Sequence, residues 1–191
     1  MYMKKVLVFL AMTIITIGSF AQDKWKVDPA HSSLNFKVLQ SGISIVNGKF
    51  LDYTGDVTID GEAYESAKIN FNVEVKSIDT NVEMRDNHLR SAEFFEVEKY
   101  PNMTFRSTKI LATGKPDYYL LYGKLTIKDV TKDVIFDVHY SGRVNSDEGD
   151  RVGVKAKTTI NRFDYNIDYD PGATGIGKDV NIIVYGQFVK Q

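Results

Sequence analysis

The stretch Lys68-Ile-Asn-Phe-Asn-Val-Glu-Val-Lys76 decides the fold, because apolar and polar residues alternate along it without a break. In an extended strand, one face would carry all of its apolar members, which are Ile69, Phe71, Val73 and Val75. This pattern is typical of antiparallel strands that have core on one side and water on the other. The stretch therefore predicts an all-β protein.

The same alternation recurs over most of the chain. Turn residues such as Ser41-Gly42, Asp60-Gly61 and Thr113-Gly114 separate the alternating runs. Together the runs predict about eight strands in hairpin-like succession. Besides the stretch above, they are 34–38, 57–59, 103–105, 119–127, 134–138, 152–160 and 180–188.

Strands of this kind close most economically into a barrel, because closure removes the exposed edges. We therefore expect an eight-stranded antiparallel β-barrel, with a sandwich of two sheets as the alternative. A barrel of about eight strands is just wide enough either to be filled by its own side chains or to hold one small ligand. The alternation does not decide between a solid and a hollow interior.

A short helical insertion is predicted after the third strand, within Ser77–Ser107. Thr80 followed by Glu83 fits a capping box, in which two side chains satisfy the free amides of the first helical turn. An apolar stripe would comprise Val82, Met84 and Leu89, and the wetter side Arg85, Asp86, Asn87 and Arg90. With the adjacent rings of Phe94 and Phe95 beneath it, this helix is expected to form a lid or plug on the barrel.

The first 21 residues differ from the rest. Lys4 and Lys5 precede an apolar run, 6–17, and Ser19 and Ala21 fit a small-residue cleavage site. This arrangement predicts a signal peptide, 1–21, cleaved after Ala21, and a single domain over 22–191 in the periplasm or secreted. The apolar run is shorter than the roughly 20 residues of a membrane-spanning helix.

Charge and cysteine content narrow the possibilities further. The formal net charge of −1 becomes −3 once residues 1–21, which contain Lys4 and Lys5 and no acid, are removed. A nucleic-acid partner, which would call for a basic face, is not expected. Without cysteine there is neither a disulfide nor a lipid-modified cysteine, so the chain is expected to rely on a full-sized core and to have no stable membrane anchor.

One glycine-rich segment, 172–179, almost matches a phosphate-binding loop. The position that should hold Ser or Thr is Asp179, and a predicted strand follows where a helix should begin. We interpret the segment as a connection. Lys178 and the free amides of the segment remain candidates for contact with an anionic group at a barrel mouth.

The three histidines do not form a recognisable reactive group. His31, His88 and His139 lack the spacing of a metal pair on one helix or hairpin. We expect His31 to tie down a turn, His88 to be ion-paired in the helical insertion, and His139 to be solvated on an outer strand face. The sequence predicts no metal site, no catalytic residues and no enzyme.

Several blocks of the sequence, taken in order, resemble the YceI-like family. They are Trp25-Lys-Val-Asp-Pro-Ala-His31-Ser-Ser-Leu-Asn-Phe36, Gly48-Lys-Phe50, Ser77-Ile-Asp-Thr80, Arg85-Asp-Asn-His88-Leu-Arg90-Ser91, Phe94-Phe95, Tyr100-Pro-Asn-Met-Thr-Phe105 and Gly123-Lys-Leu-Thr-Ile-Lys-Asp-Val-Thr131-Lys132. The resemblance implies a lipocalin-like barrel in the bacterial periplasm that holds a long polyisoprenoid chain in an elongated hydrophobic tunnel. The family often has Asp where this chain has Glu93 and Glu96.

The resemblance and the alternation together predict a binding site. The expected tunnel lining is Phe36, Val38, Phe71, Val73, Phe94, Phe95, Phe105, Leu121, Phe136 and Val138. For a diphosphate or quinone head group the candidates are Arg85, His88, Arg90 and Lys178. Arg85, Asp86 and His88 have an alternative role, which is to pin the helix to the barrel rim.

The predicted function is binding of an isoprenoid lipid or quinone for transport, storage or scavenging, with that lipid as ligand and no other cofactor. Two alternatives stay open: an enzyme acting on a lipid-like substrate through His88 and Asp86, and a solid barrel serving as an interaction module. A homodimer is possible. The prenyl length, the head group and the donor or acceptor of the lipid do not follow from the sequence.

Overall fold

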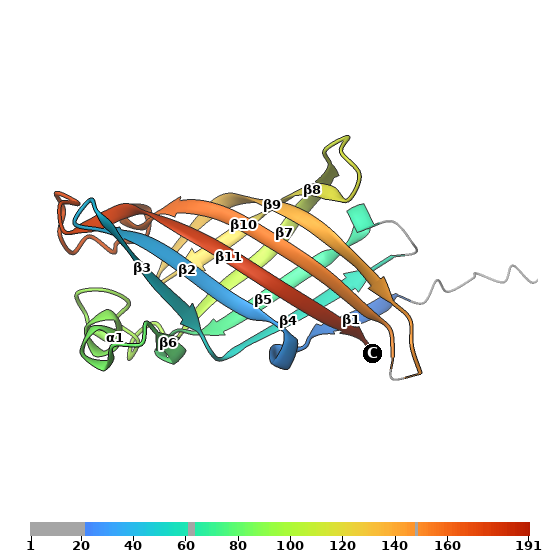
Figure 1. Cartoon of the computed structure of the whole chain (residues 1–191), viewed down its shortest axis with the longest axis horizontal. Coiled ribbons are helices and arrows are strands. Elements are labelled where there is room, and N and C mark those ends of the chain that lie inside the picture. Colours follow the sequence, from blue (N-terminus) through green and yellow to red (C-terminus); the bar gives the residue numbers. More distant parts are fainter. Residues whose placement is uncertain (1–21, 61–63, 148) are drawn as a thin grey trace, which may run out of the picture.

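The computed structural model describes residues 22–60, 64–147 and 149–191. The predicted signal peptide, 1–21, lies outside these ranges. Within the described ranges, eleven strands and one α-helix follow one another (Figure 1). Their bounds are β1 Asp23–Val27, β2 Ser33–Gln40, β3 Ser44–Phe50, β4 Tyr53–Ile59, β5 Lys68–Glu74, β6 Ile78–Asp79, α1 Glu83–Arg90, β7 Asn102–Ala112, β8 Tyr118–Ile127, β9 Val130–Val144, β10 Arg151–Asn161 and β11 Ile176–Lys190.

Eight of these strands close into a ring, in the order β1, β4, β5, β7, β8, β9, β10 and β11, because β1 also pairs with β11. All of the pairings are antiparallel, and β2, β3 and β6 extend the sheet from β11. The predicted barrel is confirmed, and the sandwich alternative is wrong. The helix α1 follows β5, the third strand of the ring along the chain, as expected.

One long edge of β11 accommodates both β1 and β2. Val184 of β11 pairs with Leu34 of β2, and Phe188 pairs with Val27 of β1. A 3₁₀ turn, Pro29–His31, separates the two short strands, and the Asp28 carboxylate caps it by accepting the Ala30 amide. His31 Nδ1 lies 2.7 Å from the same carboxylate, so His31 ties down a turn, as expected.

The strands β3 and β4 likewise form one bent strand, and Ser77 holds the bend. Its buried hydroxyl accepts the amides of Leu51 and Asp52 at 3.1 and 3.0 Å and donates to the Glu74 carbonyl at 2.6 Å. The bend lets one chain segment pair with β2 at one end of the barrel and with β1 and β5 at the other. Neither β1 nor β3 was among the predicted strands.

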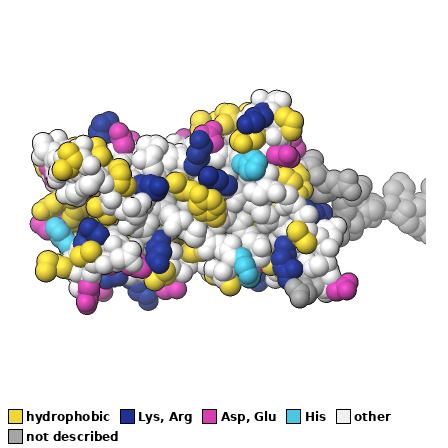
Figure 2. Space-filling model, viewed as in Figure 1, with side chains coloured by type: hydrophobic (Ala, Val, Ile, Leu, Met, Phe, Trp, Pro, Cys, Tyr) yellow, Lys and Arg dark blue, Asp and Glu magenta, His cyan; other side chains and the backbone are white. Residues whose placement is uncertain are grey.

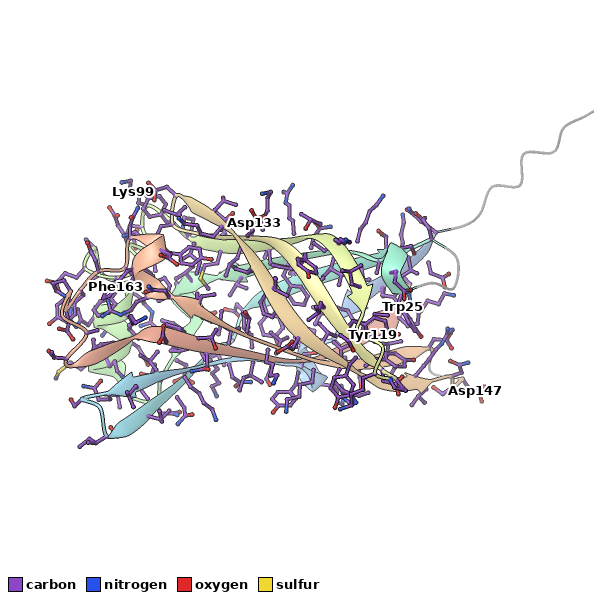
Figure 3. The ribbon with its side chains drawn as sticks, turned by 90° about the horizontal axis from the view of Figure 1, so that it is seen from above. Trp25, Lys99, Tyr119, Asp133, Asp147 and Phe163 are labelled. Atoms are coloured by element: carbon purple, nitrogen blue, oxygen red, sulfur yellow. The ribbon has the colours of Figure 1, made fainter. Side chains whose placement is uncertain are left out.

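The barrel has two dissimilar ends. We call the end that carries α1 and the loop Arg162–Ile176 the helix end, and the end where β1 begins and β11 finishes the terminal end (Figure 1). Charged side chains are spread over the outer surface of the barrel wall (Figure 2). The buried apolar side chains of the strands lie in the barrel interior, which we call the lumen. Figure 3 shows how densely side chains fill the space inside and around the barrel.

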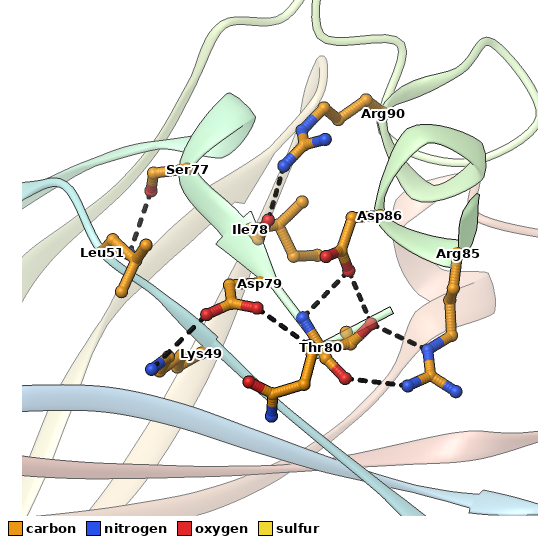
Figure 4. Close-up of polar contacts among 10 residues, drawn as sticks. Lys49, Leu51, Ser77, Ile78, Asp79, Thr80, Arg85, Asp86 and Arg90 are labelled. Atoms are coloured by element: carbon orange, nitrogen blue, oxygen red, sulfur yellow. Dashed lines mark hydrogen bonds and ion pairs between the residues drawn. The ribbon is translucent and has the colours of Figure 1, made fainter. Parts of the chain in front are cut away.

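A polar network fastens α1 to the helix end (Figure 4). The buried Asp86 carboxylate accepts the Thr80 amide at 2.9 Å and the Thr80 hydroxyl at 2.5 Å. Arg85 donates to the same hydroxyl and to the Thr80 carbonyl, at 2.7 and 2.8 Å. Arg90 donates to the carbonyls of Lys76 and Ile78, at 2.8 and 2.7 Å.

This network corrects two expectations about the helix. Thr80 and Glu83 form no capping box, because Val82 is the N-cap, no side chain caps it, and the Thr80 hydroxyl is bonded to Asp86. The apolar and polar faces were also assigned wrongly: Asp86 is buried, whereas Met84 is 83% exposed. The Asp86 carboxylate is tolerated in a buried position because the Thr80 amide and the Thr80 hydroxyl both donate hydrogen bonds to it.

Replacing Asp86 tests how much this network contributes to the free energy of unfolding. We expect Asp86→Ala to lower the free energy of unfolding by about 2–4 kcal/mol, because the buried Thr80 amide and hydroxyl lose a charged acceptor. Asp133→Ala is the matched control, since Asp133 forms only an exposed ion pair with Lys124 and should contribute about 0–1 kcal/mol. Urea denaturation measures both, and equal losses would contradict the assignment.

Candidate functional site

An apolar cavity of about 220 Å³ runs through the lumen. Residues from nearly every strand of the ring line it, and among these described residues none is charged. The lining is Trp25, Leu34, Asn35, Phe36, Phe50, Val57, Ile59, Tyr64, Ala67, Ile69, Phe71, Val73, Met103, Thr104, Phe105, Ile110, Tyr119, Leu121, Leu125, Ile127, Phe136, Val138, Tyr140, Val152, Val154, Ala156, Ile182, Val184 and Phe188. The interior is therefore not completely filled by its own side chains.

Three phenylalanine rings contact glycines of neighbouring strands. A Cβ added at Gly48 would stand 2.2 Å from the Phe36 ring, and one added at Gly55 would stand 2.7 Å from the Phe71 ring. Gly123 has the same relation to Phe105, at 2.3 Å. Such close approach requires glycine. Each ring is thereby held against the barrel wall, which leaves space along the axis.

A second, wider cavity of about 820 Å³ opens at the helix end. Side chains from β2, β3, α1 and the loop before β11 line it. Phe36 contributes to the walls of both cavities. The two spaces are therefore neighbours along the barrel, and together they run from α1 to Trp25.

Three aromatic side chains join α1 to the opposite loop at this end. The ring centroids of His88, Phe94 and Tyr169 lie 4.9–5.0 Å from one another. His88 Nε2 also lies 2.6 Å from a Glu93 carboxylate oxygen. The hydrogen-bond partner of His88 is therefore Glu93 and not the neighbouring Asp86.

The loop Arg162–Ile176 forms the other wall of the second cavity and is held by two buried or half-buried side chains. Arg162 donates to backbone carbonyls of Ile167, Tyr169, Asp170, Ile176 and Gly177. The Asp170 carboxylate accepts the Gly175 and Ile176 amides at 2.7 and 2.8 Å. These backbone hydrogen bonds, first that of Ile176 and then that of Gly175, hold the pKa of Asp170 below its ordinary value of 3.8.

The structure brings most of the predicted lining together. Phe36, Phe71, Val73, Phe105, Leu121, Phe136 and Val138 line the first cavity, and Phe36, Val38 and Phe94 line the second. Phe95 lines neither cavity; its ring packs edge-on against Phe50 with centroids 6.1 Å apart. The alternation correctly predicted that these strands present their apolar faces to one shared space.

The predicted head-group residues are not brought together. Arg85 and His88 line the second cavity, but Arg85 is bonded to Thr80 and Arg90 to two backbone carbonyls. Lys178 is part of β11, pairs with its exposed neighbour Asp179, and lines neither cavity. The contacts of Arg85 and Asp86 with Thr80 fit the alternative role given for Arg85, Asp86 and His88, which is to pin the helix to the rim, and Arg90 contributes in the same way.

Polar groups that the sequence analysis did not select lie at the terminal end of the first cavity. The Tyr64 hydroxyl donates to the Tyr140 hydroxyl at 3.0 Å, and the Tyr119 ring packs edge-on against Tyr64. Trp25 also lines the cavity there. The alternation that places Phe136 and Val138 on the inner face also predicts Tyr140 on that face, so the sequence could have identified it.

The mouth of the second cavity has an apolar rim. Ile43, at the turn between β2 and β3, is 90% exposed, and Met84, at the start of α1, is 83% exposed. Leu39, Ile45 and Val82 are also exposed nearby. In the space-filling view, apolar side chains gather at this end of the molecule (Figure 2).

Among the described residues, no group of three or more His, Cys, Asp or Glu side chains is placed to hold a metal ion. Within 22–60, 64–147 and 149–191, no helix has the length and hydropathy needed to cross a membrane. His139 stacks on Tyr118 with ring centroids 4.8 Å apart and is half-buried.

Comparison with known proteins gives a consistent result. A family model described as the YceI-like domain matches residues 25–188. The protein YceI of Salmonella arizonae is 35% identical over 185 residues, which covers 95% of each chain. The crystal structure of Burkholderia cenocepacia BcnA has a TM-score of 0.76 at 21% identity, covering 84% of this chain and 98% of that one.

A second solved structure has the same fold. A polyisoprenoid binding domain from Saccharophagus degradans has a TM-score of 0.68 at 16% identity and covers 87% of this chain and 98% of that one. At these low identities the two structures establish the barrel fold.

The carboxylate of Asp170 gives the loop a predictable response to acid. The pKa of Asp170 is lowered in the folded protein, so the ionised carboxylate stabilises the folded loop. This stabilisation is fully present above the ordinary aspartate pKa, and it is lost as the pH falls through the lowered pKa. We expect the Gly175 and Ile176 amides, corrected for intrinsic exchange, to lose about tenfold in hydrogen-exchange protection below that pKa.

The variant Asp170→Ala should show the same loss already at neutral pH. Asp168→Ala is the matched control, because Asp168 is an exposed acid of the same loop and does not accept these amides. Unchanged protection in Asp170→Ala would show that this carboxylate does not hold the loop.

Proposed function

Because the chain belongs to the YceI-like family, we propose that its barrel binds a chain-like isoprenoid lipid inside the lumen. The observation that carries the proposal is the apolar cavity that runs from Phe36 to Trp25 inside a closed ring of strands. A long apolar chain is the ligand whose shape and chemistry match such a space. The polyisoprenoid binding domain from Saccharophagus degradans, which has the same fold, supports this ligand class.

The energetics of burial favour this ligand. Each methylene group removed from water contributes about 0.8 kcal/mol, and a prenyl chain carries many such groups. Since no described lining residue of the first cavity is charged, transfer of the chain requires no desolvation of ions. Affinity would come from buried apolar area.

The size of the lumen bears on how the chain is accommodated. The first cavity, at about 220 Å³, is smaller than the ~300–1,000 Å³ of typical ligand pockets. Binding therefore requires the lining side chains to move away from the barrel axis. The wider second cavity and its exposed apolar rim at Ile43 and Met84 support entry from the helix end.

The cellular role that fits this proposal is carriage, storage or scavenging of isoprenoid lipids or quinones in the bacterial periplasm. The predicted signal peptide, 1–21, and the absence of cysteine from the sequence support this location and a soluble carrier. An apolar chain of this kind cannot cross an aqueous compartment without a protein that covers it.

The two rival functions have less support. An enzyme based on His88 and Asp86 would need these side chains to interact, but His88 is bonded to Glu93 and Asp86 to Thr80. A solid interaction module would have a filled interior, whereas a cavity runs through the lumen. Binding without catalysis is therefore the function we propose.

Obstructing the middle of the lumen tests the proposal. Ala156 lines the first cavity, and Ala156→Phe would place a ring across it, between the positions of Val138 and Val184. We expect binding of a long prenyl quinone to weaken at least about tenfold, since the chain can no longer extend along the axis. Native mass spectrometry of the loaded protein gives the bound fraction.

Lys157→Phe is the matched control, because Lys157 lies on the exposed outer face of the same strand. Val138→Phe provides a second obstruction should Ala156→Phe not fold, and circular dichroism verifies the fold of each variant. Lipid binding that survives both obstructions, or a wild-type protein that takes up no prenyl lipid, would overturn the proposal.

A further inference from the structure

The terminal end of the first cavity contains hydrogen-bond donors that lack acceptors. Trp25 is 4% exposed, and its indole Nε1–H is buried without any hydrogen-bond partner. Buried donors are nearly always paired, so an unpaired one in a cavity wall indicates a place for an acceptor. Trp25 lines the same cavity as Tyr64, Tyr119 and Tyr140.

The tyrosine pair adds a further donor. The Tyr64 and Tyr140 hydroxyls are 3.0 Å apart and share one hydrogen bond. Two hydroxyls have two hydrogens, so one O–H stays without an acceptor among the described residues whichever of them donates. Burial, and next its hydrogen bond with Tyr64, raise the pKa of Tyr140 to about 12, so its hydroxyl keeps its proton at neutral pH.

Packing places these groups at one end. Tyr64 packs against the cluster that contains Trp25, and Tyr140 pairs across the sheet with Val154, which packs against the same cluster. The Arg143 guanidinium lies 5.4 Å from the Trp25 ring centroid and also acts electrostatically on Tyr140. Trp25 and Tyr119 lie at the same end of the barrel in Figure 3.

The two cations that lie near the Trp25 ring are both ion-paired. Arg143 is ion-paired with Asp150, and Lys190, whose ammonium lies 5.9 Å from the Trp25 ring centroid, is ion-paired with Asp23. The end therefore offers neutral N–H and O–H donors and no unmatched charge from these two cations. An uncharged oxygen acceptor fits such a site better than a phosphate, whose burial would need a free cation.

We propose that the donors of Trp25 and Tyr140 bind an uncharged carbonyl oxygen, such as that of a quinone, at the end of the lipid chain. This inference rests on the proposed function and specifies the orientation of the ligand. The polar head lies at the terminal end of the lumen, and the tail extends toward α1. It replaces Arg85, His88, Arg90 and Lys178 as the head-group site.

A matched pair of ligands tests the inference. A prenyl benzoquinone and squalene, chosen with chains of the same length, differ in whether they carry the oxygen. We expect the wild-type protein to bind the quinone more tightly, and Tyr140→Phe or Trp25→Phe to weaken quinone binding about three- to tenfold while squalene binding stays unchanged. Tyr185→Phe is the control, since Tyr185 is an exposed tyrosine of β11.

Trp25 supplies a second measurement, because it is the one tryptophan in the sequence. A quinone bound as proposed lies beside its indole and quenches its fluorescence on contact, whereas squalene does not. This signal is independent of any loss of stability in the variants, since it is measured in the wild-type protein.

Equal affinity of the wild-type protein for quinone and squalene would overturn the inference and would indicate that solvent satisfies these donors. An equal loss of affinity for quinone and squalene in Tyr140→Phe would also overturn it. So would Trp25 fluorescence that stays undiminished when the quinone is bound. Failure to bind either ligand would instead contradict the proposed function itself, so the two failures are distinguishable.

Discussion

The packing of phenylalanine rings against glycines inside the barrel is the interaction on which the rest of the structure depends. Phe36 against Gly48, Phe71 against Gly55 and Phe105 against Gly123 each place a large ring where a side chain on the neighbouring strand would collide with it. In a barrel of about this strand number the interior is otherwise narrow enough to be filled by side chains. The glycines therefore determine that an apolar lumen of useful length is left.

Closure of the sheet has a second consequence, which is that the two ends acquire different chemistry. At the helix end, the contacts of Asp86, Arg85 and Arg90 are used to hold α1, and those of Arg162 and Asp170 to hold the opposite loop. The charged groups at this end are thus committed to structure. At the terminal end, Trp25 lines the first cavity and keeps a donor that no atom of the described residues satisfies, whereas the unpaired Tyr165 hydroxyl at the helix end lines neither cavity. Recognition of a polar group is expected where donors are left over.

The fold could be predicted because most strands show their inside and outside faces in the sequence. Ile69, Phe71 and Val73 alternate with polar residues and indeed face the lumen. The strand β3 was missed because its first residues, Ser44 and Ile45, are both exposed, and its inward position Gly48 carries no side chain. The strand β1 was missed because it is short and includes Lys24 and Lys26. Both segments gain their stability from pairing with distant strands.

The site was predicted less completely than the fold, for a physical reason. The lining of the lumen follows from alternation, but the partners of individual polar groups depend on tertiary contacts that alternation does not encode. Asp86 was predicted to be exposed because acidic side chains usually are. It is buried instead, where its carboxylate accepts hydrogen bonds from the Thr80 amide and hydroxyl. Tyr140 lines the cavity and continues the inward alternation of Phe136 and Val138, but it lies beyond the predicted strand 134–138 and was not selected.

The most direct test of the central claim is a crystal structure of the protein loaded with a long prenyl quinone. The account predicts continuous ligand density along the lumen, from Phe36 to Trp25, with the lining side chains moved outward to make room. Density for the lipid only on the outer surface, with the lumen side chains unmoved, would contradict it.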